Sequence, residues 1–560
     1  VNQELQEFDA LCDISDAPFI ETKQLEQEHF ECDTKAVILN IGMGGGKTTQ
    51  TVDYLKKRCH KWGGGEDNTD SFVWMTPNIA LADNTFERMG DINHTEIYNS
   101  AKRTKDKKKL ILDAKNLMIC MHSLHYTEGR ARKFDVVVID EIESFLKNWV
   151  YNTTLEGQTQ TACYAAFIDI LTHAKKIILL DAFITKLTLD FFTSLGIDYT
   201  IVKRENDLDF NERVAVKFNK SSHMIADVIK QLKKGKKVLI FYPHLRGNQA
   251  HSSMDDLRRL LVKNTKTKDA NGSTVEKKCL CHNSMTDDRT KNKLAAVNIF
   301  WKECDFVISN NVITVGVNFD EQHFDSCYLF VATFNEPRDV VQFSYRARNL
   351  TSYKVNYCFL SGKMSKDDSL LDKMTEIHTP EFQQLRRNVM LEKTSPLQQT
   401  FCRFLSLAGY TIKPEAREVR QRDLDAVEQV EASGSFYDYD KIAEVEWYEV
   451  NDLEREFYSG ECSMKTKLEL RRYHFDKWFC PGPLMQNAKL LHEVKAKIWN
   501  NNFIELATQV RLLENGHDPT IDKLKADQGW DHHFPSEIVV SHKQVSFKFA
   551  DPDAAKSIFD

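Results

Sequence analysis

The sequence of 560 residues predicts two successive α/β domains with parallel sheets, followed by a mainly α-helical region. Short runs rich in Val, Ile and Leu, of the kind that a parallel sheet buries on both faces, alternate with segments of helical periodicity. Such alternation is typical of strand–helix–strand units. The runs form two series that are separated near residues 207–213, and the strand pattern fades after Lys363.

The first series opens with an apolar strand at 36–41, a glycine-rich turn and a helix at 48–61. Further strands are predicted at 71–75, 116–121, 134–139 and 175–180. The second series begins near Val214, with strands predicted at 237–242, 278–281, 304–309, 326–333 and 355–360. Apolar residues recur at helical spacing in 380–407 and 487–514.

From these limits we predict four parts. They are an N-terminal extension (1–34), a first α/β domain (35–210), a second α/β domain (211–363) and a mainly helical accessory domain (364–560). The first residue, Val1, suggests that the chain is a piece of a longer protein.

The charge balance excludes a uniformly basic protein that coats nucleic acid. Lys and Arg number 75 against 82 Asp and Glu, a net charge of −7, so a polyanion would have to bind in a local groove. The 13 cysteines suit a reducing compartment, because a chain of this length needs no disulfide scaffold. No apolar run approaches the roughly 20 residues that cross a bilayer. We therefore expect a soluble, intracellular protein without a membrane partner.

The strongest local motif is the glycine-rich turn between the first strand and the first helix, Ile-Gly-Met-Gly-Gly-Gly-Lys-Thr at 41–48. Glycines let backbone N–H groups curl round phosphate oxygens, and the helix N-terminus adds its dipole. Lys47 supplies positive charge, and the Thr48 hydroxyl can hold Mg²⁺. Ile41 stands where the usual pattern has its first glycine. We predict that the phosphates of ATP bind Gly42, Gly44, Gly45, Gly46, Lys47 and Thr48.

A second motif is the apolar strand that ends in Asp140 and Glu141. Ligands of open parallel sheets bind outside the carboxyl ends of the strands, so both carboxylates should emerge beside the phosphate loop. Asp140 could position Mg²⁺ there, and Glu141 could polarise the attacking water. Two acids after a strand are often only a helix cap, but the preceding loop favours the functional interpretation.

A third motif, Gln342 to Arg348, lies on a helix predicted to begin near Pro337. Arginines there could reach across a cleft between the two domains to the γ-phosphate, so that hydrolysis would require the domains to close. An exposed basic helix face paired with surface acids is the alternative.

Taken together, these residues resemble the superfamily 2 helicases, and most closely the origin-binding-protein helicases of large DNA viruses, including the helicase-primase-like proteins of asfarviruses. The resemblance implies two RecA-like domains and covers approximately residues 35–360. It depends on the order of eight short motifs: the phosphate loop, Thr76-Pro77, His122-Ser123-Leu124-His125, Asp140-Glu141, Leu180-Asp181-Ala182, Ile240-Phe241-Tyr242, Thr314-Val315-Gly316-Val317 and Gln342–Arg348.

The resemblance also implies roles for single residues. Thr76, Pro77 and Ser123 would contact the nucleic-acid backbone, and Thr314 and Gly316 would do so or relay to the nucleotide. Local turn chemistry explains each of these residues equally well. The catalytic residues would be Glu141, Lys47, Gln342 and Arg346, with Arg348 as a register-shifted second arginine, and Asp181 would link nucleotide state to strand movement.

The sequence departs from the family pattern at several positions. Glu143 stands where many relatives have His or Asp, Phe343 follows Gln342, and Asn349 replaces the last arginine. No adenine-reading glutamine motif is evident upstream of Ile41. The pair Cys279 and Cys281 suggests zinc only weakly, because no second pair completes a four-ligand set.

The predicted function is an ATP-dependent, Mg²⁺-requiring DNA helicase or translocase that acts on single-stranded or forked DNA in viral genome replication. It would work in the host cytoplasm or nucleus, with a primase or another replication module as a candidate partner. Two alternatives stay open. One is an RNA helicase or duplex translocase, and the other is a non-enzymatic, nucleotide-gated scaffold.

Overall fold

The computed structural model describes residues 2–59, 70–77, 79–89, 92, 95–98, 104–130, 133–151, 157–204, 213–244, 253–268, 274–283, 296–313, 317–360, 377–414, 535–540 and 545–549. Contacts divide the chain into two compact units. The first holds both large sheets, apart from Cys281 and His282 at the end of an edge strand, and helices α12 to α14. The second holds residues 244–266, 281–296 and 425–560.

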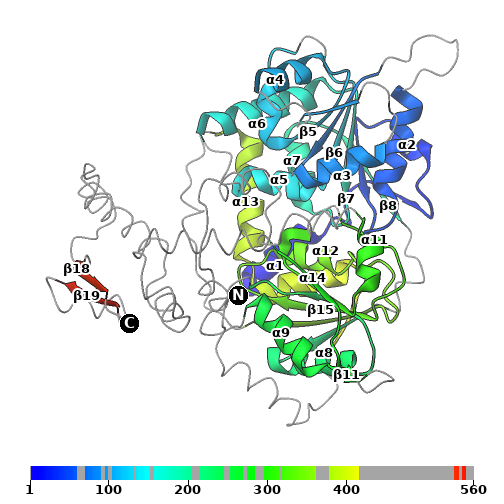
Figure 1. Ribbon diagram of the computed structural model, residues 1–560. Helices are drawn as coiled ribbons and strands as arrows, with labels where there is room; N and C mark the ends of the chain where they lie inside the picture. The colour runs from blue at the N-terminus through cyan, green and yellow to red at the C-terminus, as the bar shows by residue number, and fades with distance from the viewer. Residues whose placement is uncertain are drawn as a thin grey trace. The chain divides into compact units, whose positions relative to one another are not determined.

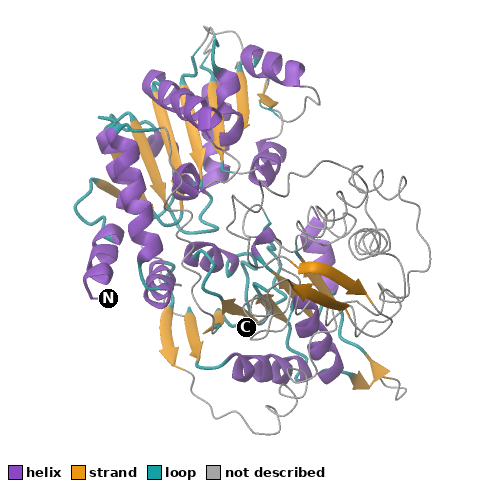
Figure 2. Cartoon of the chain, turned by 90° about the vertical axis from the view of Figure 1, so that its left-hand side faces the viewer, coloured by secondary structure: helices purple, strands orange, loops and turns teal. Residues whose placement is uncertain are grey.

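The first lobe is an eight-stranded sheet with its helices. The strand order is β1-β8-β2-β7-β6-β3-β5-β4, and all neighbours pair in parallel. Figure 2 shows these strands side by side between helices. The strands are β1 (Phe19–Thr22), β2 (Ala36–Asn40), β3 (Phe72–Thr76), β4 (Thr95–Ile97), β5 (Asn116–Cys120), β6 (Val136–Asp140), β7 (Lys176–Asp181) and β8 (Tyr199–Arg204). The helices are α1 (Asn2–Cys12), η1 (Gln27–Phe30), α2 (Lys47–Cys59), α3 (Ile79–Met89), α4 (Thr104–Asp113), η2 (Met121–Thr127), α5 (Ile142–Tyr151), α6 (Gly157–His173) and α7 (Lys186–Ser194).

The second lobe is a seven-stranded sheet with its helices, in the order β13-β14-β10-β15-β16-β9-β17. The pairings from β14 to β17 are parallel. Its strands are β9 (Val214–Phe218), β10 (Val238–Phe241), β13 (Cys279–His282), β14 (Phe306–Ser309), β15 (Ser326–Val331), β16 (Lys354–Phe359) and β17 (Thr411–Pro414). The helices are α8 (Ser221–Lys233), α11 (Val297–Phe300), η5 (Trp301–Glu303), η6 (Asn311–Ile313), α12 (Pro337–Phe343) and α14 (Leu397–Leu407).

The apolar runs form the centres of both sheets because their side chains are shielded on both faces. Every residue of β3, β5, β6 and β7 in the first lobe is buried, and so is every residue of β10, β14 and β15 in the second. Two parallel sheets with accompanying helices confirm the predicted class of two tandem α/β domains. The predicted strands agree with the observed ones to within two residues at either end.

The sequence analysis missed four strands of the two large sheets, and two of these four lie outside the predicted sheet domains. β1, from the predicted N-terminal extension, pairs with β8, and β17, from the predicted accessory domain, pairs with β9. Both are short and partly exposed, so they lack the continuous apolar pattern of the central strands. The other two are β4 and β8. The predicted limits of the four parts stay predictions.

Helix α13 (Pro380–Thr394) packs against the first lobe, although it follows the second in sequence. Its residues Phe382, Leu385 and Val389 belong to the first-lobe core. Figure 1 shows α13 beside α5 and α7, and α14 beside α12. The segment 377–414 therefore contributes one helix to each lobe.

The remaining described elements are small. Strands β11 (Thr267–Lys268) and β12 (Thr274–Val275) form an antiparallel pair. The second unit contains α9 (Met254–Asn264) and the antiparallel strands β18 (Pro535–Val540) and β19 (Val545–Phe549). The side chain of Ser253 caps the N-terminus of α9. The helical prediction for 487–514 lies outside the described residues. None of the described helices is both long and apolar enough to cross a bilayer.

Candidate active site

The glycine-rich turn connects β2 to α2, and its geometry explains its composition. Gly44 and Gly46 have φ angles of 78° and 84°, in the left-handed region that favours glycine. A Cβ on Gly45 would lie 2.4 Å from Cγ2 of Ile41 and 2.9 Å from the Gly42 carbonyl oxygen. Ile41 itself is buried. The turn therefore tolerates Ile41 in place of the usual glycine but requires glycine at position 45.

Lys47 is the first residue of α2, and its ammonium group lies against the loop. Nζ donates to the carbonyl oxygens of Ile41 at 2.6 Å and Gly42 at 3.4 Å. Burial lowers the pKa of Lys47, while the negative charge of Glu141 acts in the opposite direction. The ammonium group thus lies at the mouth of the loop, where the dipole of α2 also favours an anion.

Asp140 is the last residue of β6, and Glu141 follows it at the carboxyl edge of the sheet. Burial raises the pKa of Asp140 to about 6, against the lowering effect of Lys47. Burial, reinforced by Asp181 and Asp140, raises the pKa of Glu141 to about 7. Glu141 also has a φ of 52°, a conformation that costs a residue with a side chain roughly 1–3 kcal/mol. Strain and a raised pKa coincide at the residue predicted to activate water.

The predicted arginines lie in a turn after α12, not on the helix. The helix ends at Phe343. Two backbone hydrogen bonds between residues three apart follow, from the Tyr345 N–H to the Gln342 carbonyl and from the Arg346 N–H to the Phe343 carbonyl. Ala347 then forms an isolated β-bridge with Phe319. The prediction that the helix includes both arginines is therefore wrong, because this bridge draws the chain away from the helix axis.

Arg346 and Arg348 differ in their surroundings. Arg346 is 7% exposed and donates to the Val317 carbonyl and to Oδ1 of Asn318, both at 3.3 Å. Burial lowers the pKa of Arg346 to about 10, so the group stays charged at neutral pH. Arg348 forms an ion pair with Asp320 at 3.0 Å. Arg346 is therefore the more desolvated of the two charges.

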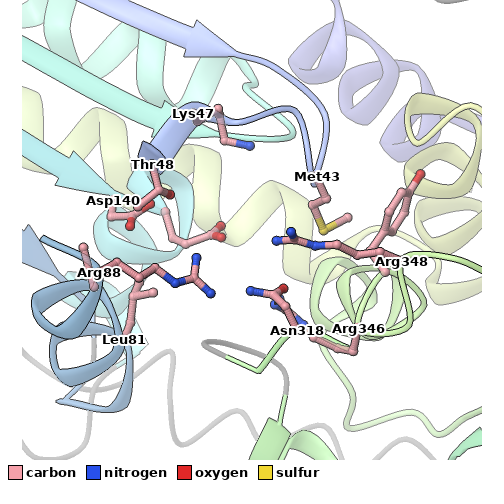
Figure 3. Close-up of a pocket in the computed structure, with 13 residues that line it drawn as sticks. Met43, Lys47, Thr48, Leu81, Arg88, Asp140, Asn318, Arg346 and Arg348 are labelled. Atoms are coloured by element: carbon pink, nitrogen blue, oxygen red, sulfur yellow. The ribbon is translucent and has the colours of Figure 1, made fainter. Parts of the chain in front are cut away.

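One pocket joins the predicted residues of the two lobes (Figure 3). Its open space, with the solvent at its mouth included, is about 650 Å³. The residues that line it are Met43, Gly44, Lys47, Thr48, Leu81, Thr85, Arg88, Asp140, Glu141, Asn318, Tyr345, Arg346 and Arg348. Gln342 lies behind it, where its Nε2 donates to Oε2 of Glu141 at 2.9 Å.

The residues predicted to hold Mg²⁺ fit a hard cation. Thr48 and Asp140 both line the pocket, and Figure 3 shows the Thr48 side chain beside the Asp140 carboxylate. Hydroxyl and carboxylate oxygens are the ligands that Mg²⁺ prefers, and a nearby cation would favour the ionised form of Asp140. Within the described ranges, no three His, Cys, Asp or Glu side chains gather as a candidate metal cluster.

The sequence analysis missed Leu81, Thr85, Arg88 and Asn318 of this pocket, and it missed a second cavity. Arg88 on α3 points its guanidinium into the pocket (Figure 3), and no motif marked it. A second cavity, which borders the glycine turn and has about 690 Å³ of open space with the solvent at its mouth included, is lined by Thr22, Lys23, Gln24, Leu25, Ile41, Gly44, Gly45, Gly46, Gln50 and Arg204. The sequence signal that could have indicated this second cavity is Gln24, a single glutamine upstream of the loop.

The residues predicted to contact nucleic acid lie at the ends of neighbouring strands. Thr76 ends β3 and Pro77 follows it, and Ser123 lies in η2 directly after β5. All three are buried. Thr314 and Gly316 lie outside the described residues. A role in strand binding stays a prediction for all five.

Comparisons with known proteins agree with the resemblance. Residues 27–214 match the sequence model of the family described as "Origin of replication binding protein". The "Putative replication origin-binding protein" of Acanthamoeba polyphaga mimivirus is 24% identical over 372 residues, which cover 63% of this chain and 41% of that protein. The replication origin-binding protein of Human herpesvirus 6B (strain Z29) is 23% identical over 54% of this chain and 35% of that protein.

A further mimivirus protein, "Uncharacterized putative helicase R8", is 22% identical over 58% of this chain and 29% of that protein. The chain thus spans less than half the length of these relatives. The resemblance to origin-binding proteins of large DNA viruses is confirmed.

Among solved structures, S. cerevisiae Dbp5 bound to RNA and ADP BeF3 is similar to 73% of this chain, with 92% of that chain covered, 14% identity and a TM-score of 0.41. Mycobacterium smegmatis helicase Lhr bound to ssDNA and AMP-PNP is similar to 80% of this chain, with 71% of that chain covered, 11% identity and a TM-score of 0.40.

Proposed function

We propose that this chain, which resembles the viral origin-binding proteins, hydrolyses ATP between its two lobes and uses the cycle to move along or unwind DNA. The observation that carries the proposal is the shared pocket. Lys47, Thr48 and Asp140 line it from the first lobe, and Arg346 and Arg348 line it from the second. A site built from both lobes ties nucleotide state to lobe movement.

Glu141 is the proposed general base. Its pKa of about 7 matches a group that takes a proton from water at neutral pH, and the proton of the attacking water passes to its carboxylate. The oxygen of that water bonds to the γ-phosphorus as the bond to the ADP oxygen breaks. Gln342, which donates to Glu141, orients the carboxylate toward the pocket.

Positive charge from both lobes stabilises the transferring phosphoryl group. Lys47 contributes from the loop and Arg346 from the second lobe, where desolvation strengthens its attraction for an anion. We assign a similar role to Arg88, which points into the pocket and whose positive charge helps to lower the pKa of Asp140 against the effect of burial. Thr48 and Asp140 would hold Mg²⁺, which supplies charge neutralisation at the phosphates when bound.

The second cavity is the proposed site of the nucleoside. It shares Gly44 with the first pocket, so a nucleotide could lie across the loop with its phosphates on one side and its base on the other. The amide of Gln24 has the donor and acceptor that match the N6 and N7 atoms of adenine. This assignment addresses the base selectivity that the sequence left open.

DNA is the proposed track because the matched relatives are named for replication origins. ATP hydrolysis is measured with and without single-stranded DNA for the wild type, Lys47→Ala and a matched control, Lys57→Ala, on the exposed face of the same helix. We expect a loss of about a hundredfold or more in Lys47→Ala and no change in Lys57→Ala. Wild-type turnover in Lys47→Ala would overturn the assignment.

Strand displacement on matched DNA and RNA substrates separates the motor alternatives. A preference for RNA would favour the RNA helicase, and ATP turnover without displacement would favour a duplex translocase. A scaffold would show no stimulation by nucleic acid and would tolerate Arg346→Ala.

A further inference from the structure

A buried ion-pair network connects the two lobes away from the phosphate pocket. Arg338, the second residue of α12, places its guanidinium 3.1 Å from Oε2 of Glu143 and 3.2 Å from Oδ1 of Asp181, and it donates to the Phe183 carbonyl at 2.7 Å. The side chain of Arg338 is 1% exposed, and both carboxylates are fully buried. A buried charge is tolerated only when it is paired, so these contacts tightly determine the position of the guanidinium, although its buried Nε has no hydrogen-bond partner among the described residues.

The first-lobe half of the network is held rigidly. Asp181 accepts hydrogen bonds from the backbone N–H groups of Glu143 at 3.0 Å and Phe183 at 2.9 Å. Glu143 accepts from the backbone and hydroxyl of Thr185 and from the hydroxyl of Thr188. These bonds keep both carboxylates in place, so Arg338 meets a preformed acceptor.

The same helix meets the catalytic edge one turn further on. Arg338 and Gln342 are four residues apart in α12 and so lie on one face of the helix. Arg338 binds Glu143, while Gln342 binds Glu141, two residues earlier in the first lobe. The helix therefore docks at two points, and the turn that follows it carries Arg346 into the pocket.

We propose that Arg338 is a positioning residue, which docks α12 on Glu143 and Asp181 so that Gln342 reaches Glu141 and Arg346 reaches the phosphate site. The proposal rests on the proposed ATPase and adds to it a residue outside the recognised motifs. It also gives a reason for Glu143, since an acid at this position can pair with an arginine of the opposite lobe. The guanidinium carbon of Arg338 also lies 4.8 Å from the ring centre of Phe404 in α14, which is a cation–π contact.

The test compares Arg338→Met and Arg338→Lys with Arg130→Met. Arg130 is also a buried arginine, but it donates to the Ile111 and Leu112 carbonyls within the first lobe. Thermal unfolding shows how far each variant is destabilised, and kcat and KM for ATP are measured on the folded protein. Lys47→Ala in the same assay tests the proposed function separately.

For Arg338→Met we expect kcat to fall about tenfold or more while KM for ATP changes by less than about threefold, since the lost contact acts on the transition state. Arg338→Lys should recover part of kcat, because an ammonium keeps the charge but cannot bind both carboxylates as the guanidinium fork does. Arg130→Met should lose stability without this kcat effect. In Glu143→Gln, a second Arg338→Met substitution should lower kcat by less than in the wild type.

Wild-type kcat in Arg338→Met, in a preparation where Lys47→Ala is inactive, would refute the positioning role and leave the proposed ATPase intact. A kcat above wild type would also refute it, because the pair would then restrain the site. An equal fall in Arg130→Met would reduce Arg338 to a purely structural residue. Full turnover in Lys47→Ala would instead refute the proposed function.

Discussion

The side-chain amide of Gln342 donates a hydrogen bond to the Glu141 carboxylate across the lobe boundary, with Nε2 and Oε2 2.9 Å apart. Glu141 has the φ of 52° and the raised pKa described above, and Gln342 stands one helical turn after Arg338. The candidate general base is therefore oriented by the opposite lobe. In this arrangement, separation of the lobes removes the base's partner as well as the arginines.

Gln342→Ala should lower kcat for ATP by about tenfold to a hundredfold with little change in KM, because the base loses its orienting partner. Gln231→Ala is the matched control, since Gln231 donates to Asp227 at 3.2 Å within the second lobe. Steady-state kinetics of both variants check the prediction. Equal kcat values for the two would contradict it.

Glu141→Gln should lose ATP turnover yet gain stability at pH 8. The folded carboxyl has a pKa of about 7, whereas an unfolded glutamate has a pKa of about 4.3, so ionisation destabilises the fold as pH rises between these values. Removing the charge should raise the free energy of unfolding by roughly 3–4 kcal/mol at pH 8, because each unit of pKa difference corresponds to about 1.4 kcal/mol. Denaturant titrations at pH 8 and pH 4 check this, and the gain should vanish at pH 4.

The pH profile of kcat/KM for ATP should show an acidic limb with a midpoint near the Glu141 pKa of about 7, because the base acts only when ionised. Activity should rise with pH and level off above the midpoint. After burial, Asp181 is the largest cause of the raised pKa, so Asp181→Asn should move the midpoint to lower pH. A wild-type midpoint near that of an ordinary glutamate would contradict this account.

Arg88→Ala should reduce kcat/KM for ATP by about tenfold or more, which corresponds to the loss of one charge-assisted bond to phosphate. Arg387→Ala, on the exposed face of α13, is the control and should be silent. An additional fall in Arg88→Ala/Arg346→Ala would show that the two arginines contribute separately. Full activity in Arg88→Ala would remove it from the site.

Gly45→Ala should weaken ATP binding, because the new Cβ would meet Cγ2 of Ile41 at 2.4 Å and the loop must shift. Overpacking of this kind costs about 1–3 kcal/mol. Ile41→Ala in the same chain should recover part of the affinity by removing Cγ2. Gly129→Ala is the control, because a Cβ there meets open space and only its φ of 82° is strained. The affinity for a fluorescent ATP analogue is measured for the wild type, Gly45→Ala, the Gly45→Ala/Ile41→Ala double variant and Gly129→Ala.

Features encoded within a few consecutive residues could be predicted from the sequence. The central strands follow from uninterrupted apolar runs, and the phosphate loop follows from glycines between a strand and a helix. Asp140 and Glu141 could be placed at the carboxyl edge because a parallel sheet brings its strand ends to one side. These predictions need no knowledge of which distant segments meet.

Long-range packing settled the remainder, because no local pattern records which distant segments meet. Strands β1 and β17 extend their sheets through backbone pairing, to which side-chain periodicity is nearly blind. Arg88 and Arg338 belong to none of the motifs. Arg88 lines the pocket between the lobes, and Arg338 pairs with a carboxylate of the opposite lobe, so each role depends on residues far away in the sequence. A buried charged group has a fixed partner and a shifted pKa. Both properties arise only when the folded chain excludes water from around the group.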